Sequence, residues 1–151
     1  MARSLAFAFV SVVFAVALVP KRAAGAPCPE ADRPPSEIGA SWDALYAHFK
    51  RFNGFGYCDD DGAVAEGNSE AVLTLLDGSW QTLPRLAELI RRDAQFEPFV
   101  LKHVDDMMDY NPLRRIRDRA RARCPAGLNA LCKKIAEAVE GILARAVPSK
   151  Q

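Results

Sequence analysis

The segment SEIGASWDALYAHFKRFNG, residues 36–54, carries the clearest signal of the fold. Its large apolar side chains recur at intervals of three and four residues, which places them along one stripe of an α-helix. Asn53 and Gly54 then supply the residue types that most often end a helix. The segment therefore predicts an amphipathic helix whose buried face is formed by Ile38, Trp42, Leu45, Tyr46, Phe49 and Phe52.

The same kind of pattern continues to the C-terminal part of the chain. Nothing alternates with a period of two for long enough to indicate a strand. A small-residue side around Gly67 in the second helix would let another helix approach closely, although Gly67 could instead break that helix. Residues 36–148 are thus expected to form one all-α domain, a compact bundle of five or six short helices. The expected starts after the first helix are Asp59–Asp61, Ser79, Asp93, Asn111 and a point near Gly127.

The N-terminal segment has the layout of a secretory signal peptide. A charged start is followed by an apolar run from Leu5 to Val19 and by small residues at 23–26. The run is shorter than the roughly 20 residues that a spanning helix needs, which favours cleavage over anchoring. Lys21 and Arg22 follow the run and would place the chain in the cytoplasm if it did anchor. We expect residues 1–25 to be removed, although cleavage after Ala26 is also possible, and the protein to be periplasmic or secreted.

Four cysteines follow this segment, at positions 28, 58, 124 and 132. An oxidising compartment permits disulfides, and four cysteines allow three pairings. Cys124 and Cys132 flank the turn between the last two expected helices, where an eight-residue spacing can bring their Cβ atoms together. Cys28 and Cys58 would then join the proline-rich arm, residues 26–35, to the first loop between helices. We expect these two disulfides rather than zinc, because no Cys-x-x-Cys pair is present.

Charge is distributed unevenly along the chain. Residues 26–110 carry 7 basic and 16 acidic side chains, whereas residues 111–151 carry 10 basic and 3 acidic ones. The near-balance of the whole argues against a general nucleic-acid binder. Either the two parts neutralise each other, with arginines reaching Asp105, Asp106, Asp109 and Asp118, or the basic part presents a face to a partner. The arginines that we expect to form such a face are Arg114, Arg117 and Arg121.

Two further features supply candidate site residues. Acidic residues from Asp59 onward fit positions 1, 3 and 12 of a calcium loop, but Val64 stands where that loop needs glycine. Capping of a helix is the favoured interpretation, and whether residues 59–61 bind a cation stays open.

His103 lies among apolar residues of its helix, which is more typical of a hydrogen-bonded core histidine than of a catalyst. His48 is expected at the boundary of the core. The acidic candidates for binding are Asp60, Asp61 and Glu66, the last either buried or exposed.

Three segments carry a resemblance to known sequences: GYCDDDGAVAEGNSE at 56–70, FVLKHVDD at 99–106 and CPAGLNALC at 124–132. They resemble short exported proteobacterial proteins of unknown function. The resemblance covers most of the chain after the signal segment and implies no activity. In architecture alone, the chain is also similar to the small, helical, disulfide-bearing immunity proteins of interbacterial toxin systems.

These observations lead to two functional hypotheses. The first is an exported, non-enzymatic helical domain that binds another protein, as an inhibitor or immunity-type protein would. The alternative is a small periplasmic hydrolase in which His103 works with Asp60, Asp61 or Glu66, which requires a carboxylate within hydrogen-bond reach of the imidazole. No catalytic or metal motif is present, and we expect no cofactor, no nucleic-acid partner and no membrane span after cleavage.

Overall fold

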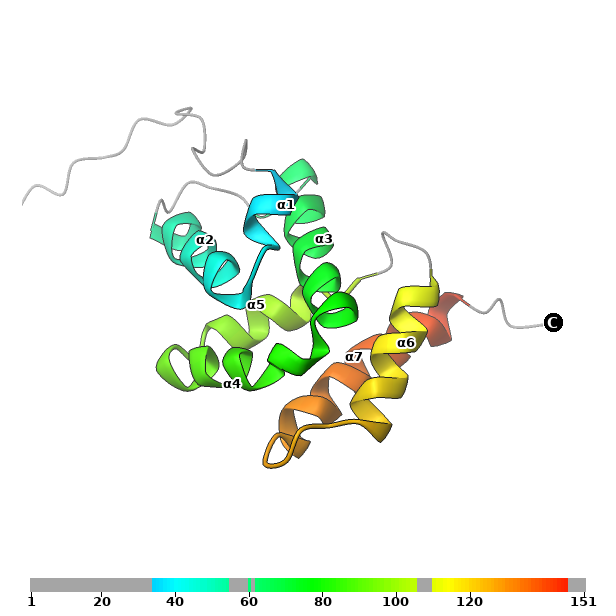
Figure 1. Ribbon diagram of the computed structural model, residues 1–151. Coiled ribbons are helices and arrows are strands. Elements are labelled where there is room, and N and C mark those ends of the chain that lie inside the picture. Colours follow the sequence, from blue (N-terminus) through cyan, green and yellow to red (C-terminus); the bar gives the residue numbers. More distant parts are fainter. Residues whose placement is uncertain (1–33, 55–59, 61, 106–109, 147–151) are drawn as a thin grey trace, which may run out of the picture.

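The computed structural model describes residues 34–54, 60, 62–105 and 110–146. Within these residues the chain is helical and contains no strand, which confirms the predicted all-α class. Predictions about the signal segment, most of the proline-rich arm, Cys28, Cys58, Asp59 and Asp61 lie outside the described residues. The helices are α1 (Pro35–Ile38), α2 (Trp42–Gly54), α3 (Gly62–Gly78), the 3-10 helix η1 (Trp80–Thr82), α4 (Leu83–Arg92), α5 (Phe96–Lys102), α6 (Tyr110–Ala122) and α7 (Asn129–Ala146) (Figure 1).

The first predicted helix is divided in two, which is why the described residues hold seven α-helices rather than five or six. α2 has its own cap, because the Ser41 hydroxyl accepts a hydrogen bond from the backbone N–H of Ala44 at 3.1 Å. The turn between α1 and α2 places Gly39 against Ala71 of α3. The predicted apolar stripe nevertheless stays intact across the break, with five of its six residues buried and Tyr46 half-buried.

α3 runs through Gly67 without a break and uses its small residues for close packing, as one of the two sequence interpretations held. A Cβ added to Gly67 would touch the ring of Pro35 at 3.6 Å. α1 therefore lies directly on α3, and Figure 1 shows the two helices in contact.

Two predicted helix starts are displaced by local turns. Ser79 provides no side-chain cap; instead its carbonyl accepts a hydrogen bond from the Thr82 hydroxyl at 2.6 Å within the 3-10 turn. α4 follows at Leu83, with Pro84 in its first turn where a missing N–H costs nothing. Asp93 lies three residues before α5, and its carbonyl accepts the N–H of Phe96 at 3.0 Å.

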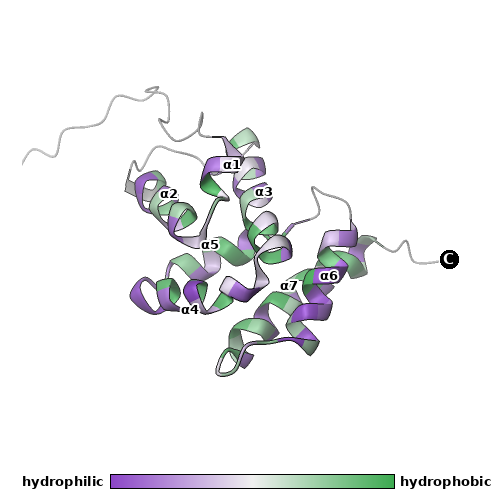
Figure 2. Cartoon of the chain, in the orientation of Figure 1, coloured by the Kyte–Doolittle hydropathy of each residue, from purple (hydrophilic) through white to green (hydrophobic). Residues whose placement is uncertain are grey.

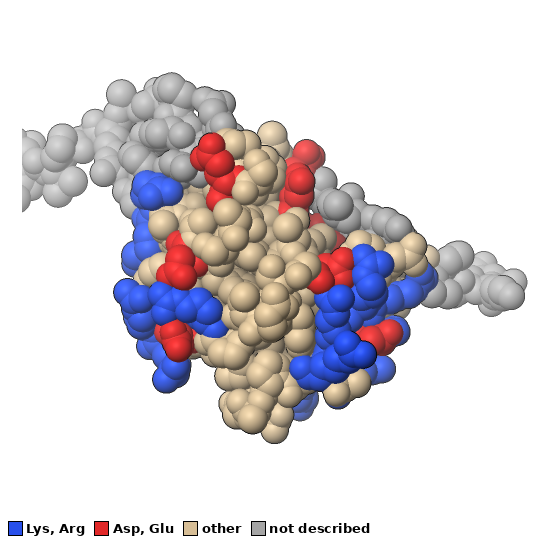
Figure 3. Space-filling view, viewed as in Figure 1, with Lys and Arg blue, Asp and Glu red and all other residues tan. Residues whose placement is uncertain are grey.

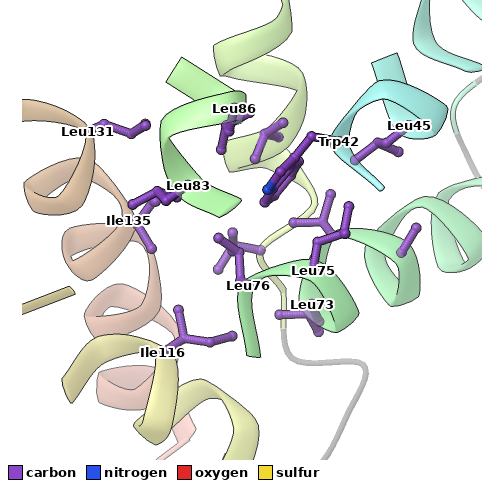
Figure 4. Packing of buried hydrophobic residues seen from close by; sticks show 14 of the residues in the cluster. Trp42, Leu45, Leu73, Leu75, Leu76, Leu83, Leu86, Ile116, Leu131 and Ile135 are labelled. Carbon is purple, nitrogen blue, oxygen red and sulfur yellow. The ribbon is translucent and has the colours of Figure 1, made fainter. Parts of the chain in front are cut away.

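One hydrophobic core joins all parts of the described chain. α6 and α7 pack along each other as a hairpin, and α6 also packs against α3. Figure 4 shows Trp42 directed toward leucines of α3 and α4, with Ile116 and Ile135 approaching from the α6–α7 side. Hydrophobic residues line the facing sides of the helices, and α4 and α6 carry many hydrophilic ones (Figure 2). The described helices therefore form a single packed unit.

The predicted disulfide between Cys124 and Cys132 is present, with the two Cα atoms 6.0 Å apart. It closes the turn between α6 and α7. No described helix combines the length and the apolar character needed to cross a bilayer.

Candidate functional site

His103 lies at the C-terminal end of α5, and only 1% of it is exposed. Its backbone N–H donates hydrogen bonds to the carbonyls of Phe99 and Val100, which completes the last turn of the helix. Its ring meets the Phe99 ring edge-on, with centroids 4.7 Å apart. The predicted core histidine is therefore confirmed.

Both ring nitrogens of His103 contact polar side chains from other segments. Nε2 lies 3.1 Å from Oδ2 of Asp60, which precedes α3, and Nδ1 lies 3.2 Å from Oγ of Ser69 within α3. The Ser69 hydroxyl in turn donates to Oδ2 of Asp105 at 2.5 Å. We call these four residues, Asp60, Ser69, His103 and Asp105, the His103 cluster.

Two neighbours hold the Asp60 carboxylate in place. Lys102 Nζ lies 2.5 Å from its Oδ2, and Asn68 donates to its Oδ1 at 3.1 Å. Partial burial favours protonation of Asp60, but the hydrogen bond from Lys102 and the charge of His103 outweigh it and keep its pKa below the usual value. Asp60 is therefore an ionised acceptor at neutral pH.

Burial dominates the titration of His103. Desolvation of the ring lowers the pKa of His103 below its ordinary 6.5, and the nearby Lys102 charge acts in the same direction. The carboxylates of Asp60 and Asp105 oppose this shift without cancelling it. The imidazole is consequently neutral at pH 7.

Sequence reasoning found only part of this cluster. It identified His103 and Asp60, but it assigned no role at this site to Ser69 and treated Asp105 as a partner for arginines. The available signal was the pair Asn68–Ser69, two polar residues that immediately precede the apolar part of α3 and are both 1% exposed. Glu66 is exposed on α3, which settles the alternative left open for it.

His48 differs from its predicted position at the core boundary. It is 1% exposed, and its ring stacks with that of Phe52 one turn later, with centroids 5.9 Å apart. The buried face of α2 therefore includes His48 in addition to its apolar residues.

The chain of contacts from Ser69 through His103 to Asp60 has the connectivity of a hydrolase triad. The surroundings argue against that chemistry. A nucleophile must reach a substrate, whereas Ser69 is 1% exposed within a continuous helix and donates its hydrogen bond to Asp105. The arrangement works instead as a buried polar cross-link between α3 and the end of α5.

A second candidate site is the arginine-rich surface of α6. On the side toward α3, Arg115 forms a two-pronged pair with Asp77, with Nε and Nη2 lying 2.9 and 2.5 Å from the carboxylate oxygens. Arg119 bonds to the same carboxylate and to the Asp77 carbonyl. Sequence reasoning missed Asp77 as a partner and named Asp118 correctly, since Asp118 pairs with Arg117 at 2.8 Å.

Three further arginines lie on α6 or directly after it. Arg121 pairs with Glu140 of α7 at 2.6 Å, and the hydrogen bond that Arg114 forms within the described residues goes to the neutral Asn111 side chain at 3.2 Å. The Arg123 guanidinium has no ion pair among the described residues. Figure 3 shows basic side chains gathered over α6, next to an uncharged area. We call Arg114, Arg121 and Arg123, all exposed, the basic face. Arg114 and Arg121 lie two turns apart on one side of α6. Arg123 follows the helix and lies beside Arg119, next to η1.

Two hollows lie in the surface of the described residues. One of about 270 Å³ lies where Arg119 and Arg123 meet Gly78 and Gln81 beside η1. A larger one of about 470 Å³ lies between α4 and the turn before α7, with Ile90, Leu128 and Leu131 in its walls. No group of three or more metal-ligating side chains is assembled within the part of the chain that the structure describes.

Comparison with known proteins gives no relative: no family model, no curated protein and no solved structure matches the chain.

Proposed function

We propose that this protein is an exported, non-enzymatic helical domain that binds another protein through the basic face of α6. The observation that carries the proposal is the imbalance of charge on the α6–α7 hairpin. Residues 110–146 hold nine basic and three acidic side chains. After the ion pairs described above, Arg114 and Arg123 still have no carboxylate partner among the described residues, so an acidic surface would complement them.

The way α6 is held supports this role. Arg115 and Arg119 fix the helix to Asp77 of α3, and the Cys124–Cys132 bond fixes its C-terminal end to α7. A helix anchored in this way presents its exposed arginines with little freedom left to lose on binding. The arginines thus divide into an inner set that anchors the helix and an outer set available to a partner.

Export and the nature of the partner complete the proposal. The N-terminal segment directs the chain to the periplasm or outside the cell, where the disulfide can form. We propose a partner with an acidic surface, such as a toxin or an envelope hydrolase that this protein inhibits. The 3.1 Å contact between His103 and Asp60 supports the hydrolase alternative. The burial of His103 and Ser69 argues against it, because a substrate would not reach them.

Affinity capture with matched charge variants tests the proposal. The mature, oxidised protein is used to capture proteins from a periplasmic extract, and the recovered partner is identified and its Kd is measured. We expect the double variant Arg114→Glu/Arg123→Glu to weaken binding about tenfold or more, which corresponds to roughly 1.4 kcal/mol. We also expect the wild-type affinity to fall as salt rises, because exposed charges are screened.

The control is Arg91→Glu/Lys133→Glu, which changes the net charge by the same amount at exposed positions on α4 and α7. It should leave the affinity unchanged within about twofold. Recovery of no partner at either low or physiological salt would refute the proposal. Equal losses in the two double variants would assign the effect to net charge rather than to the basic face.

A further inference from the structure

The hollow between η1 and α6 is lined by charged side chains that do not balance one another. Its volume is about 270 Å³, and its charged lining groups are the guanidiniums of Arg119 and Arg123 and the carboxylate of Asp77. Two positive charges therefore face one negative charge. The lining carries one positive charge in excess, which a single anion would neutralise.

The Asp77 carboxylate is already occupied and leaves little for Arg123. Arg115 donates to both of its oxygens, from Nε at 2.9 Å and from Nη2 at 2.5 Å, and Arg119 Nη1 lies 3.1 Å from Oδ1. A carboxylate that already accepts from two guanidiniums has few lone pairs left for a third. Arg123 accordingly lines the hollow without forming an ion pair within the described residues.

Only one nitrogen of Arg119 is used to anchor α6. Nη1 bonds to the carboxylate and to the backbone carbonyl of Asp77. Nε and Nη2 form no hydrogen bond within the described residues, and 29% of the side chain is exposed. These two nitrogens form the edge of the guanidinium with which Arg115 binds Asp77. Arg119 can thus hold Asp77 with one nitrogen and offer this edge to a ligand.

Arg123 is held in position through its backbone. Its N–H donates to the Arg119 carbonyl at 2.7 Å, so the helical turn continues to Arg123 and places the two arginines on neighbouring turns of one side. Its carbonyl accepts a hydrogen bond from the Trp80 indole N–H at 2.8 Å. Cys124, the next residue, is bonded to Cys132. A side chain on a backbone fixed in this way has less freedom to lose when a ligand binds.

We propose that this hollow is a binding site for one carboxylate group, which Arg119 and Arg123 bind together. Planar guanidiniums pair with a carboxylate through two parallel hydrogen bonds. The excess of one positive charge matches a carboxylate better than a doubly charged phosphate group. The exposed Gln81 side chain brings an amide donor to the same hollow from η1. We call this hollow the carboxylate site.

The size of the carboxylate site indicates what carries the carboxylate. A cavity of about 150 Å³ can hold a benzene molecule, so a hollow of 270 Å³ admits the end of an acidic side chain together with its stem. An aspartate or glutamate side chain of the partner is therefore its natural occupant, an assignment that rests on the proposed function. Arg123 belongs to the basic face, so an acidic surface bound there would lie next to the site.

Titration of the oxidised mature protein with a blocked glutamate, followed by nuclear magnetic resonance, tests the site without a partner. The probe is N-acetylglutamic acid α-amide, which carries one carboxylate, and N-acetylglutamine α-amide is its neutral counterpart. At constant ionic strength, we expect the Trp80 indole and the Gln81 side-chain amide to shift saturably with the glutamate probe, with a Kd of roughly 1–10 mM. The glutamine probe should shift neither signal. Trp42 does not line the hollow and serves as an internal reference.

Three variants identify the arginine that binds. Arg123→Gln should weaken binding of the glutamate probe about tenfold or more. Arg123→Lys keeps the charge but loses the planar pair of donors, and it should weaken binding about three- to fivefold. Arg114→Gln is the matched control, because it removes an exposed arginine from the same helix that does not line the hollow. It should keep the Kd within about twofold. An unchanged Trp80 indole signal before the probe is added shows that a variant keeps its fold.

Several results would overturn the carboxylate site. These are the absence of a saturable shift up to about 50 mM probe, an equal response to the two probes, and equal losses in Arg123→Gln and Arg114→Gln. Tighter binding of inorganic phosphate than of the glutamate probe would overturn the assignment to a carboxylate.

The same two single variants test the occupant once a partner has been captured. Arg123→Gln should weaken the partner more than Arg114→Gln does, and equal affinities would show that the carboxylates of the partner bind elsewhere. The probe titrations involve no partner. Failure of the carboxylate site and failure of the binding proposal are therefore separate results.

Discussion

Gly39 lies against Ala71 so closely that a Cβ on Gly39 would stand 3.1 Å from the Ala71 Cα atom and 2.9 Å from the Pro35 carbonyl oxygen. Both atoms belong to the backbone and cannot move aside as the end of a flexible side chain would. Ala71 is itself fully buried in α3. The contact explains why this position needs glycine, since only a residue without a side chain lets α1 reach α3 here.

We predict that Gly39→Ala destabilises the fold by about 1–3 kcal/mol, because the added methyl group must push α1 and α3 apart. Urea unfolding followed by circular dichroism measures the free energy of unfolding. Gly78→Ala is the matched control, since a Cβ there meets nothing within 4 Å. It should change the stability by no more than about 0.5 kcal/mol. Equal losses in the two variants would show that the contact with Ala71 does not matter.

Asp77→Asn should loosen the attachment of α6 to α3. The hydrogen bond from Arg115 is the main reason that the pKa of Asp77 lies below its usual value, and Arg119 adds to it. The amide keeps the shape but loses the charge and one acceptor oxygen. Because the site is partly exposed and screened, we predict a loss of about 1 kcal/mol at pH 7.

The same variant has a defined pH dependence. A carboxylate whose folded pKa is lowered stabilises the fold above its unfolded pKa and loses that contribution as the pH falls through the folded value. The difference between wild type and Asp77→Asn should therefore shrink below about pH 4. Asp118→Asn, in an exposed pair within α6 itself, is the control and should stay within about 0.5 kcal/mol of the wild type.

The parts of the fold that follow from local spacing were predictable from sequence. The buried stripe from Ile38 to Phe52 appears in the periodicity, because a helix repeats every 3.6 residues. The Cys124–Cys132 bond was predictable because its residues are close in the chain. The close approach of Gly39 to α3 was not, since Ala71 lies more than 30 residues away in the sequence.

The same distinction between local spacing and contacts of distant residues applies to the candidate sites. The burial of His103 could be seen in its apolar neighbours, but its partners Asp60 and Ser69 come from a separate segment, 43 and 34 residues away. Asp77 was missed for the same reason, since it reaches Arg115 across 38 residues. Sequence identifies side chains with unusual surroundings, whereas packing decides which of them meet.

The Cys124–Cys132 disulfide should contribute about 2–3 kcal/mol to stability by restricting the unfolded chain. We predict this loss in the double variant Cys124→Ala/Cys132→Ala, measured by urea unfolding with Cys28 and Cys58 left unchanged. Peptide mapping of the unreduced wild-type protein should recover the two cysteines in one linked peptide. Recovery of either residue linked to Cys28 or Cys58 would contradict the pairing.

Lys102→Met should raise the pKa of both Asp60 and His103. Lys102 donates the strongest of the hydrogen bonds that hold the pKa of Asp60 down, and its positive charge also lowers the pKa of His103. Methionine keeps most of the apolar stem and removes the charge. Carboxyl and imidazole chemical shifts followed over pH 3–8 measure both values in one series.

The upward shift at Asp60 has a consequence for acid stability. The stabilisation from the ionised Asp60 is present above its unfolded pKa and is lost as the pH falls through its folded pKa, so a raised folded pKa brings the loss to a higher pH. Lys102→Met should therefore begin to unfold at a less acidic pH than the wild type. Lys133→Met is the control, because Lys133 is exposed on α7 and pairs only weakly, at 3.8 Å, with Glu137 of its own helix. If the two variants moved the acid transition equally, Lys102 would have no specific role at Asp60.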